Sequence, residues 1–307
     1  MIDCLIIGAG PGGITAGIYA KRANLKTVML EKGAPGGKMT TTFEVDNWPG
    51  SGRISGPDLS MEMFTHAQNT GVEYQYGDVQ DITVEDGFKR VHLSDGSTID
   101  ARSIIIASGM DSRRLNATHE EKYLVRGISF CAVCDGAFYK GQHVVVLGGG
   151  NSAMEEANYL TTLDIDVTIV HRREGFRADK HAVEIAQANP RISWKLGYVL
   201  TEYMGENFVE AIKIKNVETG EEEILKTSAV FMFIGHLPNT TFLKQLPITN
   251  DWGFIEANEK METAVPGVFA IGDVIDKELR QIVTAASDGA IAAQNVVKYL
   301  EAQKRIE

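Results

Sequence analysis

One glycine-rich pattern occurs twice in this chain, and the repetition constrains its fold more than any other feature. The first copy, Gly8-Ala9-Gly10-Pro11-Gly12-Gly13, follows an apolar run, and so does the second, Gly148-Gly149-Gly150-Asn151-Ser152-Ala153. Each has the form G-x-G-x-x-G/A between a strand-like run and a helix-like stretch, the turn that brings a pyrophosphate to a helix N-terminus. Two copies at equivalent places predict an α/β protein with two Rossmann-like dinucleotide-binding domains.

The two copies differ where each would meet the ribose of its nucleotide. Counting the same distance from the first glycine reaches Glu31 in one copy and His171 in the other. A carboxylate accepts a hydrogen bond from a ribose 2′-hydroxyl, which suits FAD or NAD. His171 is followed by Arg172 and Arg173, and with Arg177 these cations suit the 2′-phosphate of NADPH. A basic cluster can also be a solvated helix face, so this second interpretation depends on the glycine motif beside it.

An internal duplication predicts how the domains are connected. The apolar stretches that end at Gly109 and Gly235 look equivalent, so each would belong to one dinucleotide-binding domain. We expect a discontinuous domain of residues 1–113 and 243–307, with residues 114–242 inserted as a second domain. The expected elements are a helix at 14–24, a strand at 26–31, a loop at 33–56, a helix at 57–70, short strands at 72–106, a β-α-β unit at 144–171, hairpin-like strands at 192–226 and a last helix at 281–303.

Composition excludes several classes of function. The chain has 307 residues, room for two domains, and its formal net charge of −11 argues against general nucleic-acid binding. No apolar run approaches the roughly 18 residues that span a bilayer, and no targeting signal precedes the first glycine motif. We therefore expect a cytoplasmic protein that binds neither nucleic acid nor membrane.

The three cysteines carry a second signal. Their number excludes a disulfide-stapled secreted scaffold, and Cys4, in the first predicted strand, reads as a buried apolar residue. Cys131-Ala132-Val133-Cys134 is a C-x-x-C, typical of redox or metal chemistry in a reducing compartment. A closed zinc site needs two more ligands, and only His143 is near, so we expect no metal.

Two nucleotide sites and a dithiol together predict a path for electrons. NADPH gives up a hydride, a flavin accepts it, and a C-x-x-C pair stores the two electrons as two thiols. Disulfide exchange requires a thiolate, so a group that donates and accepts protons is useful beside the pair. Asp135, directly after Cys134, is the candidate for that role, although it can also be a helix-start aspartate.

With these motifs the chain resembles the low-molecular-weight bacterial thioredoxin reductases. The resemblance rests on residues in the family's order along nearly the whole chain, and C-x-x-C-D-G just upstream of the second glycine motif is its most specific part. The matching residues are Gly8 to Gly13, Asn47-Trp48-Pro49-Gly50, Cys131 to Gly136, Gly148 to Ala153, His171-Arg172-Arg173, Phe176-Arg177-Ala178, Gly272-Asp273 and Arg280-Gln281.

The resemblance implies a three-layer ββα fold in each domain, a homodimer, thioredoxin as the partner, and FAD and NADPH as cofactors. It implies that Cys131 attacks thioredoxin, that Cys134 is the flavin-side thiol, and that Asp135 is the general acid and base. The implied FAD residues are Gly8, Gly10, Pro11, Gly13, Glu31, Lys38, Asn47, Gly109, Gly272, Asp273, Arg280 and Gln281. The implied NADPH residues are Gly148, Gly150, Asn151, Ser152, Ala153, His171, Arg172, Arg173 and Arg177.

The chain departs from the family pattern at two places near these sites. Lys38 stands where the family usually has Gln, which places a cation near the flavin or simply in solvent, and Val133 replaces the usual Thr. Neither change removes a reacting group. Two alternatives remain: a reductase of another thioredoxin-like or peroxiredoxin-linked dithiol partner, and a nucleotide-binding sensor in which the C-x-x-C is only structural.

Overall fold

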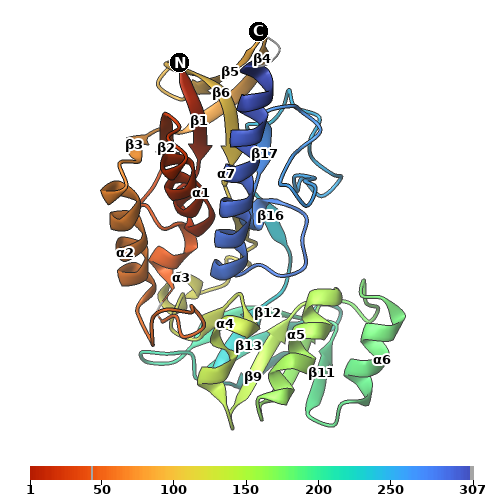
Figure 1. Ribbon diagram of the computed structural model, residues 1–307. Coiled ribbons are helices and arrows are strands. Elements are labelled where there is room, and N and C mark those ends of the chain that lie inside the picture. Colours follow the sequence, from red (N-terminus) through yellow and green to blue (C-terminus); the bar gives the residue numbers. More distant parts are fainter. Residues whose placement is uncertain (43, 305–307) are drawn as a thin grey trace. The chain divides into compact units, whose positions relative to one another are not determined.

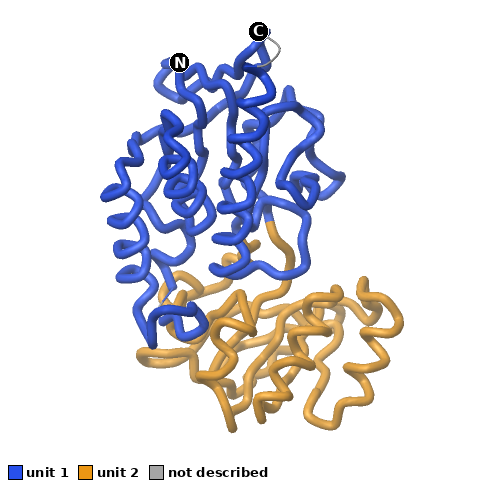
Figure 2. The backbone as a smooth tube through the Cα atoms, viewed as in Figure 1, with its two compact units in different colours: residues 1–111, 237–307 blue, residues 112–236 orange. Residues whose placement is uncertain are grey.

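The computed structural model describes residues 1–42 and 44–304, which divide into two compact units. Unit 1 comprises residues 1–111 and 237–307 and unit 2 residues 112–236 (Figure 2). The sequence-based boundaries, 113/114 and 242/243, lie slightly further along the chain at both junctions. Residue 43 and residues 305–307, which the predicted first domain includes, lie outside the described residues. The two connecting segments, β7 (Met110–Ser112) and β16 (His236–Pro238), pair with each other as a two-stranded sheet.

Unit 1 is built on a sheet with strand order β3-β2-β1-β6-β5-β4, and β17 pairs with β6. Strands β1, β2, β3, β17 and the end of β6 are parallel, whereas β4, β5 and the start of β6 form an antiparallel meander. The elements are β1 (Ile2–Ile7), α1 (Pro11–Arg22), β2 (Thr27–Glu31), η1 (Gly37–Thr41), α2 (Gly56–Asn69), β3 (Glu73–Tyr76), β4 (Val79–Glu85), β5 (Phe88–Leu93), β6 (Thr98–Ile106), β17 (Val268–Ala270), η3 (Gly272–Val274) and α7 (Ile282–Lys304), drawn in Figure 1.

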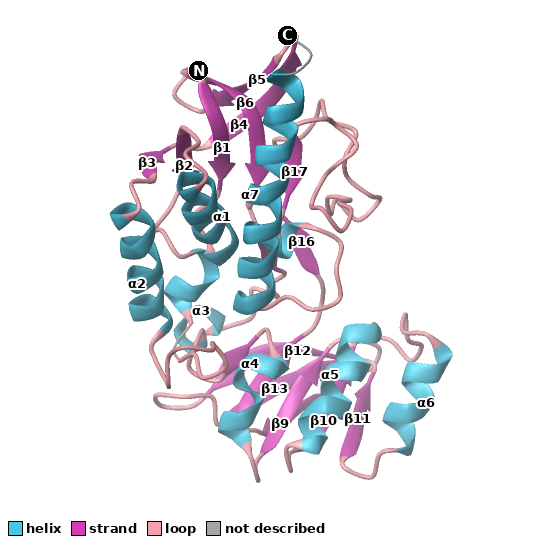
Figure 3. Cartoon of the chain, in the orientation of Figure 1, coloured by secondary structure: helices cyan, strands magenta, loops and turns pink. Residues whose placement is uncertain are grey.

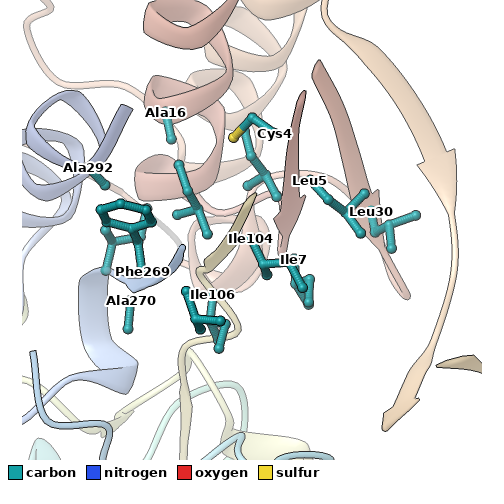
Figure 4. Packing of buried hydrophobic residues seen from close by; sticks show 14 of the residues in the cluster. Cys4, Leu5, Ile7, Ala16, Leu30, Ile104, Ile106, Phe269, Ala270 and Ala292 are labelled. Carbon is teal, nitrogen blue, oxygen red and sulfur yellow. The ribbon is translucent and has the colours of Figure 1, made fainter. Parts of the chain in front are cut away.

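The core of unit 1 lies between the parallel strands and the helix pair α1 and α7 (Figure 4). The last four residues of strand β1, Cys4 to Ile7, are apolar and buried, as expected of a strand buried on both faces. Ala16 of α1 and Ala292 of α7 are fully buried, and such small side chains let helices pack closely. The closest approach is at Gly289 of α7, where a Cβ atom would collide with the carbonyl oxygen of Gly12. Helix α7 therefore packs directly against the first glycine turn and helps to hold it in place.

Unit 2 repeats this plan with a second parallel sheet, in the order β11-β10-β9-β15-β8, and a separate antiparallel sheet β12-β13-β14 (Figure 3). The elements are α3 (Glu120–Tyr123), β8 (Ile128–Ser129), α4 (Ala132–Asp135), η2 (Gly136–Tyr139), β9 (His143–Leu147), α5 (Asn151–Thr162), β10 (Asp166–His171), α6 (Lys180–Ala188), β11 (Ile192–Leu196), β12 (Tyr198–Met204), β13 (Ala211–Asn216), β14 (Glu222–Lys226) and β15 (Ala229–Met232).

Alternation along β9 explains the three layers of unit 2. Val144 and Val146 pack with the helix side chains of α5 and α6, whereas Val145 and Leu147 pack with β12 and β13. Successive side chains of a strand point to opposite faces, so one buried strand joins two cores. The order of the layers is therefore helices, parallel sheet, antiparallel sheet.

Two sequence-based element predictions need correction. The first helix begins at Pro11 rather than at 14, because proline suits the first helical position directly after the glycine turn. The segment 192–226 is hairpin-like only from Tyr198, since β11 instead pairs in parallel with β10. Gly197, at φ +75°, makes the turn that separates these two pairings.

Val125 adopts a backbone conformation that its side chain disfavours. It lies at φ +57° in the turn after α3, and its side chain is half exposed. A β-branched residue in the left-handed region is strained by about 1–3 kcal/mol, and glycine relieves this strain at an entropic cost of about 0.5–1 kcal/mol. We expect Val125→Gly to raise the free energy of unfolding by about 1 kcal/mol, measured by thermal unfolding. Asn24→Gly is the control, because Asn24, at φ +62°, already tolerates this region. A lower Tm for the Val125 variant would contradict the expectation.

Candidate functional site

The first glycine turn leaves open space and free donors at the start of α1. A Cβ atom on Gly13 would collide with the carbonyl oxygen of Gly8, which itself lies at φ +107°, so neither position accepts a side chain easily. A Cβ atom on Gly10 would meet nothing within 4 Å. Gly10 is the N-cap residue of α1, and among the described residues no side chain caps this helix with a hydrogen bond. This cradle fits a diphosphate.

Glu31, at the end of β2, is held beside that turn. Its two carboxylate oxygens accept hydrogen bonds from the N–H groups of Ala9 and Gly33, both at 2.8 Å. Each carboxylate oxygen has further lone-pair capacity, so the group can still accept a hydroxyl. The sequence-based role of Glu31 as a ribose acceptor is thus compatible with its position.

Lys38 and Asp273 form an ion pair, with 3.3 Å between Nζ and Oδ2. The residues are far apart in the chain, and only the family resemblance predicts that both contact FAD. The adjacent Gly272 lies at φ +74° and donates its N–H to the buried carboxylate of Asp288, which also accepts from Lys277 at 2.5 Å. The Lys38 cation therefore faces the predicted FAD residue Asp273 rather than only solvent.

Three further predicted flavin residues, Asn47, Arg280 and Gln281, lie near the start of α7. Asn47 donates its side-chain amide to Gln281 Oε1 at 3.1 Å, across more than 200 residues of chain. Arg280 stacks 4.7 Å from the ring centroid of Phe254, and burial lowers the pKa of its guanidinium. Gly109, at φ +68°, directly precedes β7. The structure thus brings Asn47 and Gln281 into direct contact, and their predicted contact with the flavin stays a prediction.

The second glycine turn repeats the cradle in unit 2. Gly148 lies at φ +151°, and a Cβ atom there would press on the Phe233 carbonyl and on Ala153. Gly150 has open space within 4 Å of its Cβ position and caps α5 without a side-chain hydrogen bond. Asn151 accepts the N–H of Asp179 at 2.8 Å, and Ser152 is exposed beside it.

The arginine segment folds back onto that same turn. The N–H groups of Arg177 and Ala178 both bond to the carbonyl oxygen of Gly149, at 2.7 and 3.1 Å. The side chains of Arg172, Arg173 and Arg177 are exposed and make no hydrogen bond or ion pair with any residue in 1–42 or 44–304. Such unpaired cations beside a nucleotide turn suit a 2′-phosphate.

His171 behaves differently from the arginines that follow it. A Cβ atom on Gly149 would collide with its ring, and the ring stacks on Phe176 with 5.8 Å between centroids. Its Nε2 is buried without a hydrogen-bond partner among the described residues. Burial lowers the pKa of His171, and the three neighbouring arginines lower it further, so the ring is neutral at neutral pH. His171 supports the turn, and its predicted contact with NADPH stays a prediction.

Cys131 and Cys134 form a disulfide at the start of α4. Cys131 is the N-cap residue, and its Sγ accepts the N–H of Cys134 at 3.1 Å. Val133, between them, is 39% exposed, whereas Ala132 is buried. Burial raises the pKa of Glu156 on α5, and the nearby N–H of Ala132 lowers it in part. The disulfide turn is therefore held by its own hydrogen bond from Cys134 N–H to Cys131 Sγ, and it is open to solvent at Val133.

Asp135 lies against this disulfide turn, together with two residues that sequence reasoning missed. Its N–H bonds to the Cys131 carbonyl at 3.1 Å, and its Oδ2 accepts the hydroxyl of Ser129 at 2.6 Å. Burial, and then the charge of Asp135, raises the pKa of Tyr139 to about 12, so this phenol stays protonated. A serine two residues before a C-x-x-C was visible in the sequence, but no motif marks it.

Two kinds of site are not found in the described part of the chain. No group of three or more His, Cys, Asp or Glu residues is placed to hold a metal ion. No helix combines the length and the apolar character that crossing a membrane requires.

Known proteins resemble this chain over nearly its whole length. Residues 2–289 match the model of the pyridine nucleotide-disulphide oxidoreductase family. The chain is 46% identical over 300 residues to the thioredoxin reductase of Bacillus subtilis, covering 97% of this chain and 95% of that protein. It is similar to the crystal structure of the Streptococcus pyogenes thioredoxin reductase, with 45% identity, a TM-score of 0.94 and coverage of 98% and 99%. This likeness confirms the predicted α/β fold with two dinucleotide-binding domains. The chain therefore belongs to the pyridine nucleotide-disulphide oxidoreductase family, and within it to the thioredoxin reductases.

Proposed function

We propose that this chain transfers electrons from NADPH, by way of FAD, to the Cys131–Cys134 disulfide and from there to oxidised thioredoxin. The observation that carries the proposal is the disulfide at the start of α4, in the same unit as a glycine turn flanked by unpaired arginines. The relatives described above carry the name thioredoxin reductase, which supports thioredoxin as the substrate.

In this proposal each cradle takes one cofactor. The turn at Gly8–Gly13 with Glu31 would hold the adenosine diphosphate half of FAD, and Asn47, Asp273 and Gln281 would lie along the rest of it. The turn at Gly148–Ala153 with the arginines would hold NADPH. When bound, the two cofactors supply hydride transfer and a two-electron relay.

The chain's own residues then carry out the exchange of thiols and disulfide. Reduction of the Cys131–Cys134 bond takes two electrons and gives two thiols. Cys131 attacks a partner disulfide as a thiolate, and Cys134 then displaces the mixed disulfide, which restores the starting bond. Each thiolate that leaves takes up one proton, and in this proposal Asp135, whose backbone N–H bonds to the Cys131 carbonyl, supplies it.

We also propose that the protein is cytoplasmic and that it forms a homodimer, the latter as the family resemblance implies. Thiols are kept reduced in the cytoplasm, and a disulfide reductase supplies the electrons for this. Light scattering on the purified protein measures the mass in solution, and the mass of one chain would contradict the dimer.

A direct assay tests the proposal. The purified, FAD-loaded protein is given NADPH with thioredoxin, NADPH without thioredoxin, and NADH with thioredoxin, and coenzyme oxidation is followed by absorbance. We expect turnover only when thioredoxin is present, with NADPH strongly preferred over NADH. Flavin reduction without thioredoxin turnover would instead favour another thioredoxin-like or peroxiredoxin-linked dithiol partner. A protein that ignores NADPH would contradict the proposed electron path as a whole.

A further inference from the structure

Ser129 occupies a fixed place directly before the redox pair. It is the last residue of β8, which pairs in parallel with β15 so that Ser129 lies opposite Phe231. Ser129 is 4% exposed, whereas Asp135 and both cysteines are only partly buried. A side chain on a paired, buried strand has less freedom than one on a single helical turn such as α4. Ser129 is therefore the more rigid member of this group.

The hydroxyl of Ser129 connects Cys131 to Asp135. Its Oγ lies 2.6 Å from Asp135 Oδ2 and accepts the backbone N–H of Cys131 at 3.2 Å. The Cys131 carbonyl, at 3.3 Å, is a second possible acceptor for the single hydroxyl proton. The shorter contact to the charged oxygen is the stronger one, so the proton points to the carboxylate. One hydroxyl thus holds the backbone of the attacking cysteine and the neighbouring carboxylate together.

We infer that Ser129 is a positioning residue for proton transfer at the redox pair, acting through Asp135. The inference rests on the proposed function, in which Asp135 exchanges protons with the thiols. In the forward exchange, Cys131 bonds to one partner sulfur as the partner disulfide breaks, and the leaving thiolate takes a proton. Cys134 then closes the enzyme disulfide and expels the second partner thiolate, which takes another proton. Both electrons come from the enzyme dithiol, and Ser129 keeps the Asp135 carboxyl at the place where those protons move.

Replacement of Ser129 with Ala in the full-length, FAD-loaded protein is the direct test. We expect kcat with thioredoxin to fall on the order of 10-fold, less than the 10²–10⁴-fold that a complete general acid or base supplies. Loss of the hydrogen bond from Ser129 disfavours the ionised form of the Asp135 carboxyl group. One limb of the pH–rate profile should depend on Asp135 and vanish in Asp135→Asn. In Ser129→Ala this limb should move to higher pH. Flavin reduction by NADPH, followed without thioredoxin, should keep its wild-type rate.

Three further variants separate positioning from simple damage. Ser129→Thr keeps the hydroxyl and should keep the wild-type limb, so this variant carries the test even if Ala prevents folding. Ser103→Ala is the matched control, because Ser103 is also buried and donates to the Asp3 carbonyl at 2.7 Å, but it belongs to unit 1 and not to the unit that holds Cys131 and Cys134. Its pH profile should be unchanged. In the double variant Ser129→Ala/Asp135→Asn, the loss should equal that of Asp135→Asn alone.

The possible failures are distinguishable. If Asp135→Asn is slow while Ser129→Ala keeps both the wild-type kcat and its limb, the inference is wrong and the proposed function stands. An additional loss in the double variant, or a displaced limb in Ser129→Thr, would likewise overturn it. Full activity of Asp135→Asn would remove Asp135 from the proposed mechanism, and the role of Ser129 with it.

Discussion

Replacement of Cys131 with Ser should abolish thioredoxin reduction while leaving flavin reduction by NADPH intact. Serine cannot form the disulfide, so the two electrons have no acceptor beyond the flavin. The turn itself should survive, because Cys131 caps α4 with its side chain and serine is also a favoured N-cap residue. Rapid-mixing absorbance of the flavin, together with steady-state coenzyme oxidation, measures both halves of the reaction.

The third cysteine provides a matched control for that experiment. Cys4 is fully buried in β1, and burial raises the pKa of its thiol to about 12, so it stays protonated and inert. Cys4→Ser should leave the ratio of the two half-reactions unchanged, whatever it does to stability. Persistent thioredoxin turnover in the Cys131 variant would contradict the thiol roles assigned here.

Replacement of both Arg172 and Arg173 with Ala should weaken NADPH binding and nearly spare NADH. Each charge-assisted contact to a phosphate is worth about 1.5 kcal/mol or more, roughly a factor of ten in affinity per arginine. The two coenzymes differ only in the 2′-phosphate, so the ratio of their kcat/KM values isolates this term. We expect that ratio to fall on the order of 100-fold, and to recover in part with lysine at both positions.

Arg191 is the control for charge alone. It lies in the same unit but is paired with Asp164 and Asp166, so it is already neutralised locally. Arg191→Ala should leave the preference for NADPH unchanged. An equal loss with NADPH and NADH in the double arginine variant would exclude the 2′-phosphate as its target.

Motifs with short-range physical causes were predicted well from the sequence. Position 13 must be glycine because a Cβ atom there would collide with the carbonyl oxygen of Gly8, only five residues earlier in the chain. A constraint between residues so close in sequence can be predicted without a structure. The α/β fold with two dinucleotide-binding domains is likewise implied by the two β-α-β units, whereas the three-layer arrangement is implied only by the family resemblance. The C-x-x-C and its following aspartate were recognised by residue type and spacing.

Contacts between distant segments were not predicted. The Lys38–Asp273 ion pair and the Asn47–Gln281 hydrogen bond join residues more than 200 positions apart, and no local pattern records which partner a side chain will meet. Strand β11 was misread for a related reason. Its sequence alternates apolar and polar residues as a hairpin strand does, and only the tertiary arrangement decides that it pairs in parallel with β10.

The close fit of Gly289 on α7 against Gly12 has a consequence for how the chain is made. Unit 1 needs both ends of the polypeptide, whereas every residue of unit 2 has been synthesised before α7 emerges. During translation the inserted unit can therefore fold first, while β1 and α1 wait for a partner that is nearly the whole chain away. A polypeptide truncated before α7 would contain a folded unit 2 joined to a sheet of unit 1 whose apolar face is exposed. Chaperones would be expected to bind such a chain.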